Sequence, residues 1–229
     1  MYVLKKNSLK RYNIMTIELN QVELDITKEI ISIGIAKAAD SFSFFIKGKV
    51  MINLMDLKVN FKNYFPLSRK YPTDRNYLLT TVIKGELKGE SYLLFNEQEA
   101  ESIVDANLPD NIKNNPVEKA KMTEAFLLEI DNIITASVIT QFSNIFQRKI
   151  YGDVPSLNIL LGNEINQFLS ANHNKDLNVI YFNARFITEN TEINPEFIWL
   201  MDDTFFEEVK KLLSNEKKLE LFQKINSTN

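Results

Sequence analysis

The stretch KEIISIGIAKAADSFSFFIKGKV, residues 28–50, returns in altered form as LEIDNIITASVITQFSNIFQRKI, residues 128–150. Glu29 aligns with Glu129 at an offset of 100 residues. In both stretches the apolar residues recur at helical spacing and cover most of the circumference, which is typical of a helix buried on more than one side. The two stretches therefore predict a pair of long core helices and an internal duplication of the chain.

The segments that follow each predicted helix occur in the same order in both halves. YLLFNEQEAESI, residues 92–103, aligns with IWLMDDTFFEEV, residues 198–209, at an offset of 106. β-Branched and partly alternating segments predict three strands after each long helix, and a short helix closes each half. One more short helix is predicted over 161–174, between the first two strands of the second half. The predicted order is helix 24–46, strands 49–61, 77–87 and 90–95, helix 96–108, helix 117–146, strands 149–154, 177–187 and 195–201, and helix 202–214.

This order of elements predicts an α+β fold. Both long helices are expected on one face of a largely antiparallel sheet of about six strands, to which both halves contribute. Three strands and one helix bury too little surface to be stable alone, so the repeats, about 21–108 and 117–215, are expected to form one pseudo-symmetric domain within 21–229. Residues 1–20 are interpreted as an N-terminal extension with a candidate edge strand near 14–19, and the end of the chain as a helical tail.

Composition narrows the possible functions. Lys and Arg number 27 against 30 Asp and Glu, giving a net charge of -3 and a pI near 5.4, so no binding to nucleic acid is expected. The absence of cysteine excludes disulfides and thiolate chemistry and fits a cytoplasmic protein. Charged and amide residues interrupt every apolar run before it reaches the roughly 20 residues that span a bilayer, so no membrane insertion is expected. The single histidine, His173, lies in a polar segment and does not favour a catalytic triad or a histidine metal site.

Polar residues interrupt both predicted core helices at corresponding places. Glu129 and Asn132 are three residues apart and share a helical face, as do Glu29 and Ser32 in the first half. An unsatisfied buried polar group costs about 1–3 kcal/mol, and a buried charge costs more. These pairs are therefore expected to face solvent, either as an ordinary hydrated stripe or as a functional surface.

The pattern Glu129-x-x-Asn132, followed after 22 intervening residues by Pro155 in QRKIYGDVPSL, resembles the signature of the CheC/CheX/FliY phosphatases of bacterial chemotaxis. The family also has Ser or Asp four residues before the Glu, where this chain has Ala125. In the first half Asp25 and Glu29 match, but Ser32 replaces the Asn and Met55 replaces the Pro. Each half is therefore incomplete in a different place, and the resemblance spans about residues 20–215.

The resemblance implies hydrolysis of the phosphoaspartate of a CheY-type response-regulator receiver domain. Asn132 is expected to position the attacking water, because a carboxamide has both a donor and an acceptor and needs no particular protonation state. Glu129 is expected to pair with the lysine of the receiver. The resemblance implies no metal or cofactor on this chain, since the receiver brings its own Mg²⁺.

Other interpretations remain open at the level of sequence. Ser32 is shorter than an Asn, so Asp25, Glu29 and Ser32 are interpreted as a degenerate second site that keeps a docking role. An alternative is a non-catalytic adapter that binds a receiver domain or a CheD-like partner. A structural role in a flagellar switch is less favoured, because nothing in the chain resembles the separate C-terminal module of the relatives that have that role.

Overall fold

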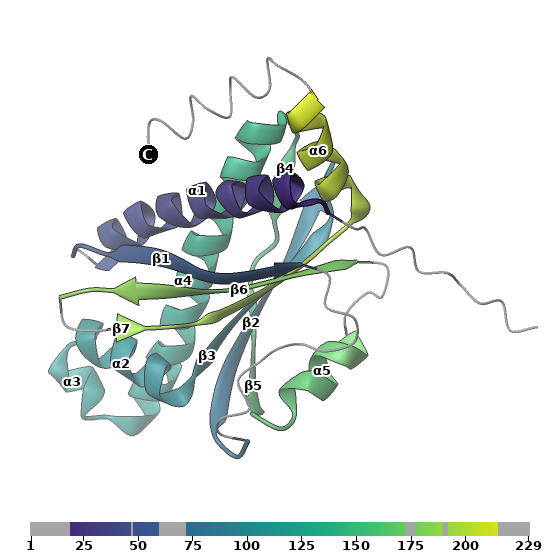
Figure 1. The fold of residues 1–229 in the computed structure, drawn as a ribbon. Helices are drawn as coiled ribbons and strands as arrows, with labels where there is room; N and C mark the ends of the chain where they lie inside the picture. The colour runs from purple at the N-terminus through teal and green to yellow at the C-terminus, as the bar shows by residue number, and fades with distance from the viewer. Residues whose placement is uncertain (1–18, 47, 60–71, 173–176, 190–191, 215–229) are drawn as a thin grey trace, which may run out of the picture.

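The computed structural model describes residues 19–46, 48–59, 72–172, 177–189 and 192–214 (Figure 1). Most of the expected N-terminal edge strand, the C-terminal tail and His173 lie outside these residues. The helices are α1 (Gln21–Ile46), α2 (Glu97–Asn107), α3 (Asp110–Lys113), α4 (Pro116–Phe146), α5 (Ile165–Asn172) and α6 (Asp203–Ser214). The strands are β1 (Met51–Val59), β2 (Arg75–Gly85), β3 (Gly89–Asn96), β4 (Ile150–Gly152), β5 (Ser156–Leu161), β6 (Asn178–Ile187), β7 (Glu192–Ile193) and β8 (Glu196–Met201).

The strands form one eight-stranded sheet with the order β1-β6-β8-β3-β2-β4, in which β5 also pairs with β2 and β7 with β6. Every pairing is antiparallel. The order is symmetric about the central β3–β8 pair, and the outer strands are exchanged: β1 of the first half lies beside β6, and β4 and β5 lie beside β2. The predicted α+β fold with a largely antiparallel sheet is confirmed. The sheet is larger than the expected six strands, because β5 and β7 were not predicted, and neither was the short helix α3.

The two long helices cross on one face of the sheet (Figure 1). A Cβ atom on Gly34 of α1 would lie only 2.9 Å from Val138 Cγ1 and 3.1 Å from Val138 Cα, so a side chain at this point would force the helices apart. The hydroxyl oxygens of Ser41 and Ser137 lie 3.1 Å apart near the same crossing. The crossing thus depends on the small residue in the first half.

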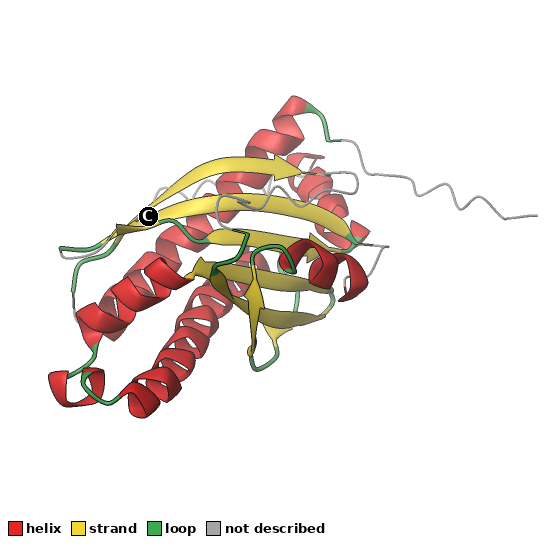
Figure 2. Cartoon of the chain, turned by 90° about the horizontal axis from the view of Figure 1, so that it is seen from below, coloured by secondary structure: helices red, strands yellow, loops and turns green. Residues whose placement is uncertain are grey.

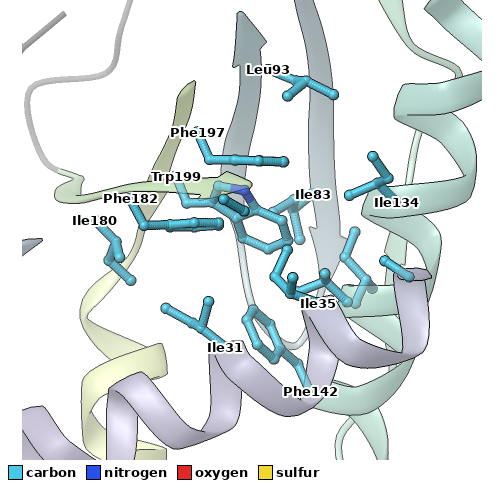
Figure 3. Close-up of a cluster of buried hydrophobic side chains, with 14 of the residues drawn as sticks. Ile31, Ile35, Ile83, Leu93, Ile134, Phe142, Ile180, Phe182, Phe197 and Trp199 are labelled. Carbon is cyan, nitrogen blue, oxygen red and sulfur yellow. The ribbon is translucent and has the colours of Figure 1, made fainter. Parts of the chain in front are cut away.

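The main core lies between these helices and the sheet. Phe142 of α4 contacts Trp199 of β8 in an edge-on arrangement, with ring centroids 5.4 Å apart (Figure 3). Phe182 and Phe197 stack in parallel on neighbouring strands, with centroids 4.7 Å apart. A smaller apolar cluster on the opposite face is covered by α5 (Figure 2). Such extensive burial on both faces makes the sheet and α4 a rigid base for the residues that α4 exposes.

Helix α4 is anchored at both ends. The Asn115 side chain accepts hydrogen bonds from the first backbone amides, and Pro116 occupies the first turn, where it leaves no amide unpaired. At the other end Gln147 adopts a left-handed conformation and ends the helix. The next residue, Arg148, bonds to the buried Glu208 of α6 at 2.9 Å and to Glu86 at 3.0 Å.

By length and composition α4 is, within the described part of the chain, the one helix long and apolar enough to cross a membrane. The charged residues of α4, the last of them Asp131, nevertheless leave no uninterrupted apolar run of about 20 residues in it. In the fold its apolar side is buried against the sheet and α1. Its hydrophobicity is accounted for by the core.

Candidate functional site

Glu129 and Asn132 both lie exposed on the outer side of α4. The two residues between them, Ile130 and Asp131, are buried toward the core. This alternation follows from helix geometry, since residues three apart share a face while the intervening ones turn toward the sheet. The expected solvent-facing carboxylate and carboxamide are therefore found together, one turn apart, on a helix whose opposite side is packed against the sheet.

A buried polar cluster lies directly beneath this exposed pair. Thr81 of β2 donates its hydroxyl hydrogen to Asp131 Oδ2 at 2.6 Å, and Thr135 donates to Asp131 Oδ1 at 3.2 Å. The hydroxyl oxygen of Ser91, on β3, lies 3.5 Å from that of Thr135. We call Asp131, Thr135, Thr81 and Ser91 the Asp131 cluster; it joins α4 to the two central strands of the first half.

Burial raises the pKa of Asp131 from 3.8 to about 6, while the hydrogen bonds from Thr81 and Thr135 act in the opposite direction. No charged neighbour contributes to this shift. Sequence reasoning missed this residue. The available signal was an Asp at a helix position whose neighbours one turn away, such as Leu127 and Ile134, are apolar.

Pro155 lies in the connection between β4 and β5, directly before the first residue of β5. At the end of β4, a Cβ on Gly152 would contact Ile139 of α4 at 3.3 Å. Ile139 is two helical turns from Asn132 and therefore lies on nearly the same side of α4. The strand that leads to Pro155 thus runs along the side of the helix that carries Asn132.

The first-half residues form a different surface. Glu29 and Ser32 are half-buried, and the Ser32 hydroxyl donates to the Lys28 carbonyl of its own helix at 2.8 Å. Asp25 is exposed and accepts a hydrogen bond from Gln21 at 2.9 Å. The hydroxyl that would have to bind water is therefore already bonded to the backbone.

The other first-half position, Met55, lies in β1 with 41% of its surface exposed. The two motif sets lie on different helices, and across the described residues no hydrogen bond or salt bridge joins them. They are two separate surfaces on one helical layer.

No protein-family model matches the chain, and no curated protein sequence matches it. Solved structures do share its fold. FliY from Thermotoga maritima aligns with a TM-score of 0.64 and 16% identity, over 91% of this chain and 100% of that one. A structure of the FliG–FliM complex from H. pylori aligns with a TM-score of 0.57 and 9% identity, over 82% and 100%. A CheX protein from Desulfovibrio desulfuricans aligns with a TM-score of 0.48 and 18% identity, over 76% and 97%.

The chain thus has an α+β fold in which long helices pack on a curled antiparallel sheet, and it shares this fold with FliY and with the structure of the FliG–FliM complex. The likeness to FliY extends over nearly the whole chain. This confirms the fold that was expected from the resemblance of the Glu129, Asn132 and Pro155 pattern to the CheC/CheX/FliY family.

Proposed function

We propose that this protein hydrolyses the phosphoaspartate of a CheY-type receiver domain, with Asn132 positioning the water. The observation that carries the proposal is the exposure of Glu129 and Asn132 together on a helix whose intervening residues are buried. Their side chains can enter a partner's site without a change in the fold. Pro155, in the connection that follows β4, is the third residue of the pattern on which the resemblance rests.

The chemistry asks little of this chain. The water oxygen attacks phosphorus in line, the bond between phosphorus and the aspartyl oxygen breaks, and the products are the free carboxylate and inorganic phosphate. In this proposal the receiver supplies Mg²⁺ and a lysine to neutralise charge, so positioning remains the main task. The Asn132 carboxamide accepts a hydrogen bond from the water through its oxygen or donates one through its nitrogen.

Glu129 has a separate role in the proposal. One turn from Asn132, its carboxylate would pair with the receiver's lysine and thereby set the register of the carboxamide against the phosphoryl group. The first-half residues Asp25 and Glu29 would form a separate, negatively charged docking surface that does not hydrolyse phosphate. A cytoplasmic location, where receiver domains act, fits the absence of cysteine.

A second candidate is a non-catalytic adapter that binds a receiver domain or a CheD-like partner. Two observations favour it: Ala125 replaces a polar residue of the motif, and the fold is shared with a structure of the FliG–FliM complex. Binding by the same helix face would then remain while hydrolysis was lost.

Phosphate release from a phosphorylated receiver domain in the presence of Mg²⁺ distinguishes these functions. The wild-type protein should accelerate release, Asn132→Ala should abolish the acceleration, and Ser32→Ala, the matched change in the first half, should leave it intact. Acceleration that survives Asn132→Ala would contradict the assignment of the site. Binding of the phosphorylated receiver without acceleration would establish the adapter.

A further inference from the structure

The positions of the Asp131 cluster have counterparts in the other half of the chain, and those counterparts are apolar. At the offset of 100 residues, Ile31 and Ile35 of α1 correspond to Asp131 and Thr135 of α4. At the offset of 106, Phe197 of β8 corresponds to Ser91 of β3. These first-helix contacts are therefore made by apolar side chains alone, and Figure 3 shows Ile31, Ile35 and Phe197 within the same core.

The fourth member of the cluster follows the same rule. The counterpart of Thr81 in β6 depends on which strand pairing is used to align the two halves. Aligning the β2–β3 pair with the β6–β8 pair gives Phe182. Aligning the pairs that β2 and β6 form with the outer strands gives Ala184. Both are buried and apolar. All four polar positions under α4 thus have apolar counterparts under α1.

Stability does not explain this difference. Each buried polar group must be compensated by hydrogen bonds, and replacing a buried polar network with packed apolar residues is often neutral or stabilising. The first half shows that the sheet accepts the apolar version. The polar version is found only under the helix that carries Asn132, and its carboxylate belongs to the residue next to Asn132 in the chain.

We propose that Asp131 is a positioning residue for Asn132: its buried carboxylate, held by Thr81 of β2, fixes the rotation of α4 that presents the carboxamide to a receiver domain. This inference rests on the proposed function for its catalytic consequence. The hydrogen bonds have direction, whereas apolar contacts let a helix roll and slide by small amounts. A bond of 2.6 Å from Thr81 of β2 therefore locates this turn of the helix more sharply than packing does.

Removing one hydroxyl tests the link with little change of shape. Thr81→Val should lower kcat for receiver dephosphorylation by roughly tenfold, with KM nearly unchanged, because small misplacements of a catalytic group are costly. Thr123→Val is the matched control, since Thr123 is a buried threonine of α4 itself and, within the described part of the chain, bonds only to the Lys119 carbonyl of its own helix, at 2.8 Å. Thr81→Ser should restore the rate, as it keeps the hydroxyl.

A second readout does not depend on enzymatic activity. The side-chain amide signals of Asn132 in a ¹⁵N NMR spectrum, assigned by their loss in Asn132→Ala, should shift with a midpoint near pH 6. Asp131→Asn should remove that titration. The surrounding elements carry further ionisable groups, among them Glu129 on α4, Lys84 on β2, Glu90 on β3 and Tyr151 on β4, and none of them contributes to the pKa shift of Asp131.

The outcomes separate the two proposals. If the amide titration is present but wild type releases no phosphate, Asp131 still positions Asn132 and the phosphatase function fails. If Asn132→Ala abolishes hydrolysis while Thr81→Val matches Thr123→Val and no titration is seen, the positioning role is overturned. Melting curves of each variant show that it is folded, and Asp131→Asn supplies the comparison should Thr81→Val fail to fold.

Discussion

The two helix–sheet contacts of this protein differ in chemistry while sharing one architecture. At the positions under α1 that correspond to the Asp131 cluster the side chains are apolar, and Ile31 and Ile35 belong to the same buried core as Phe182 and Phe197 of the second-half strands. Under α4 a carboxylate, Asp131, is bonded to a threonine of the first-half sheet. The half with the polar contact is also the half that exposes a carboxamide, Asn132. The buried carboxylate, which costs free energy to desolvate, thus lies on the same helix as the carboxamide whose position is proposed to be functional.

The two outer strands differ in a similar way. In β1, Leu54 and Leu57 are three residues apart, but their partners in β6 are only two residues apart. The extra residue of β1 forms a β-bulge at the position of Met55. On the other edge, Gly152 and Ser156 are four residues apart, but their partners in β2 are only three residues apart. The strand is interrupted at this point, which divides it into β4 and β5. Both edges therefore take up one extra residue at the same place. Only in the second half does Pro155 turn this bulge into a break, because proline cannot donate to a strand.

Exchanging the interiors should have the largest effect on stability. Ile31→Asp would place a carboxylate in the apolar core at the position that corresponds to Asp131, where Phe182 or Ala184 stands in place of Thr81, and should cost about 4 kcal/mol or more of the free energy of unfolding. Urea denaturation measures this cost. Ile31→Val, which removes one methylene, is the control and should cost about 1 kcal/mol. A cost for Ile31→Asp close to that of the control would show that the first-half core tolerates polarity and would remove the contrast.

The pH dependence of stability should differ between wild type and Asp131→Asn. Because burial raises the pKa of Asp131 to about 6, the folded state holds this proton more tightly than the unfolded state does. The resulting stability is fully present below the unfolded pKa of about 4 and is lost as the pH rises through about 6, by roughly 3 kcal/mol in all.

Urea midpoints of both proteins between pH 4 and 8 test this. Asp131→Asn should gain stability relative to wild type as the pH rises, since an amide does not ionise. A difference between the two proteins that stays constant with pH would mean that the carboxyl is not desolvated as the fold indicates.

The helix crossing provides a smaller effect. Gly34→Ala places a methyl group 2.9 Å from Val138 Cγ1 and should destabilise the fold by about 1–3 kcal/mol, although alanine favours a helix. Adding Val138→Ala should restore part of that loss, which a double-mutant cycle of urea midpoints would measure. Additive effects of the two changes would place the strain elsewhere.

The edge strands should show the smallest effect. Pro155→Ala frees a backbone torsion in the unfolded chain and should cost about 0.5–1 kcal/mol, while Met55→Ala, at the matching bulge of β1, should cost less because Met55 is 41% exposed. Thermal melting of both variants makes the comparison. A larger loss from Met55→Ala would show that the continuous edge, rather than the broken one, holds its helix in place.

Much of the architecture followed from local signals. The helix predicted over 117–146 begins one residue earlier, because Pro116 is accommodated in the first helical turn, and ends at the predicted residue. β5 was missed because the segment Ser156–Leu161 follows a proline and lacks clear alternation. It becomes a strand by pairing with the edge of β2, a contact to residues that lie about 80 positions earlier in the chain.

In the candidate site, too, some features follow from the local sequence and others depend on distant contacts. The spacing of Glu129 and Asn132 was enough to place both side chains on one outward face, because that depends only on the helical repeat. The role of Asp131 was hidden, since its partner Thr81 is 50 residues away and belongs to the other half of the chain. The apolar neighbours of Asp131 one turn away indicated a buried position, but the local sequence does not show which side chain satisfies its carboxylate.

The amino-acid order alone therefore sets the helices, most strands, the repeat and the residues that α4 turns outward, because each of these depends on neighbours within a few turns of chain. The exchange of outer strands, the glycine contact between the helices and the bond from Thr81 to Asp131 arise only when distant segments pack together. Those long-range contacts determine how firmly Asn132 is held, since directional bonds to a buried sheet restrict a helix in ways that its own hydrogen bonds cannot.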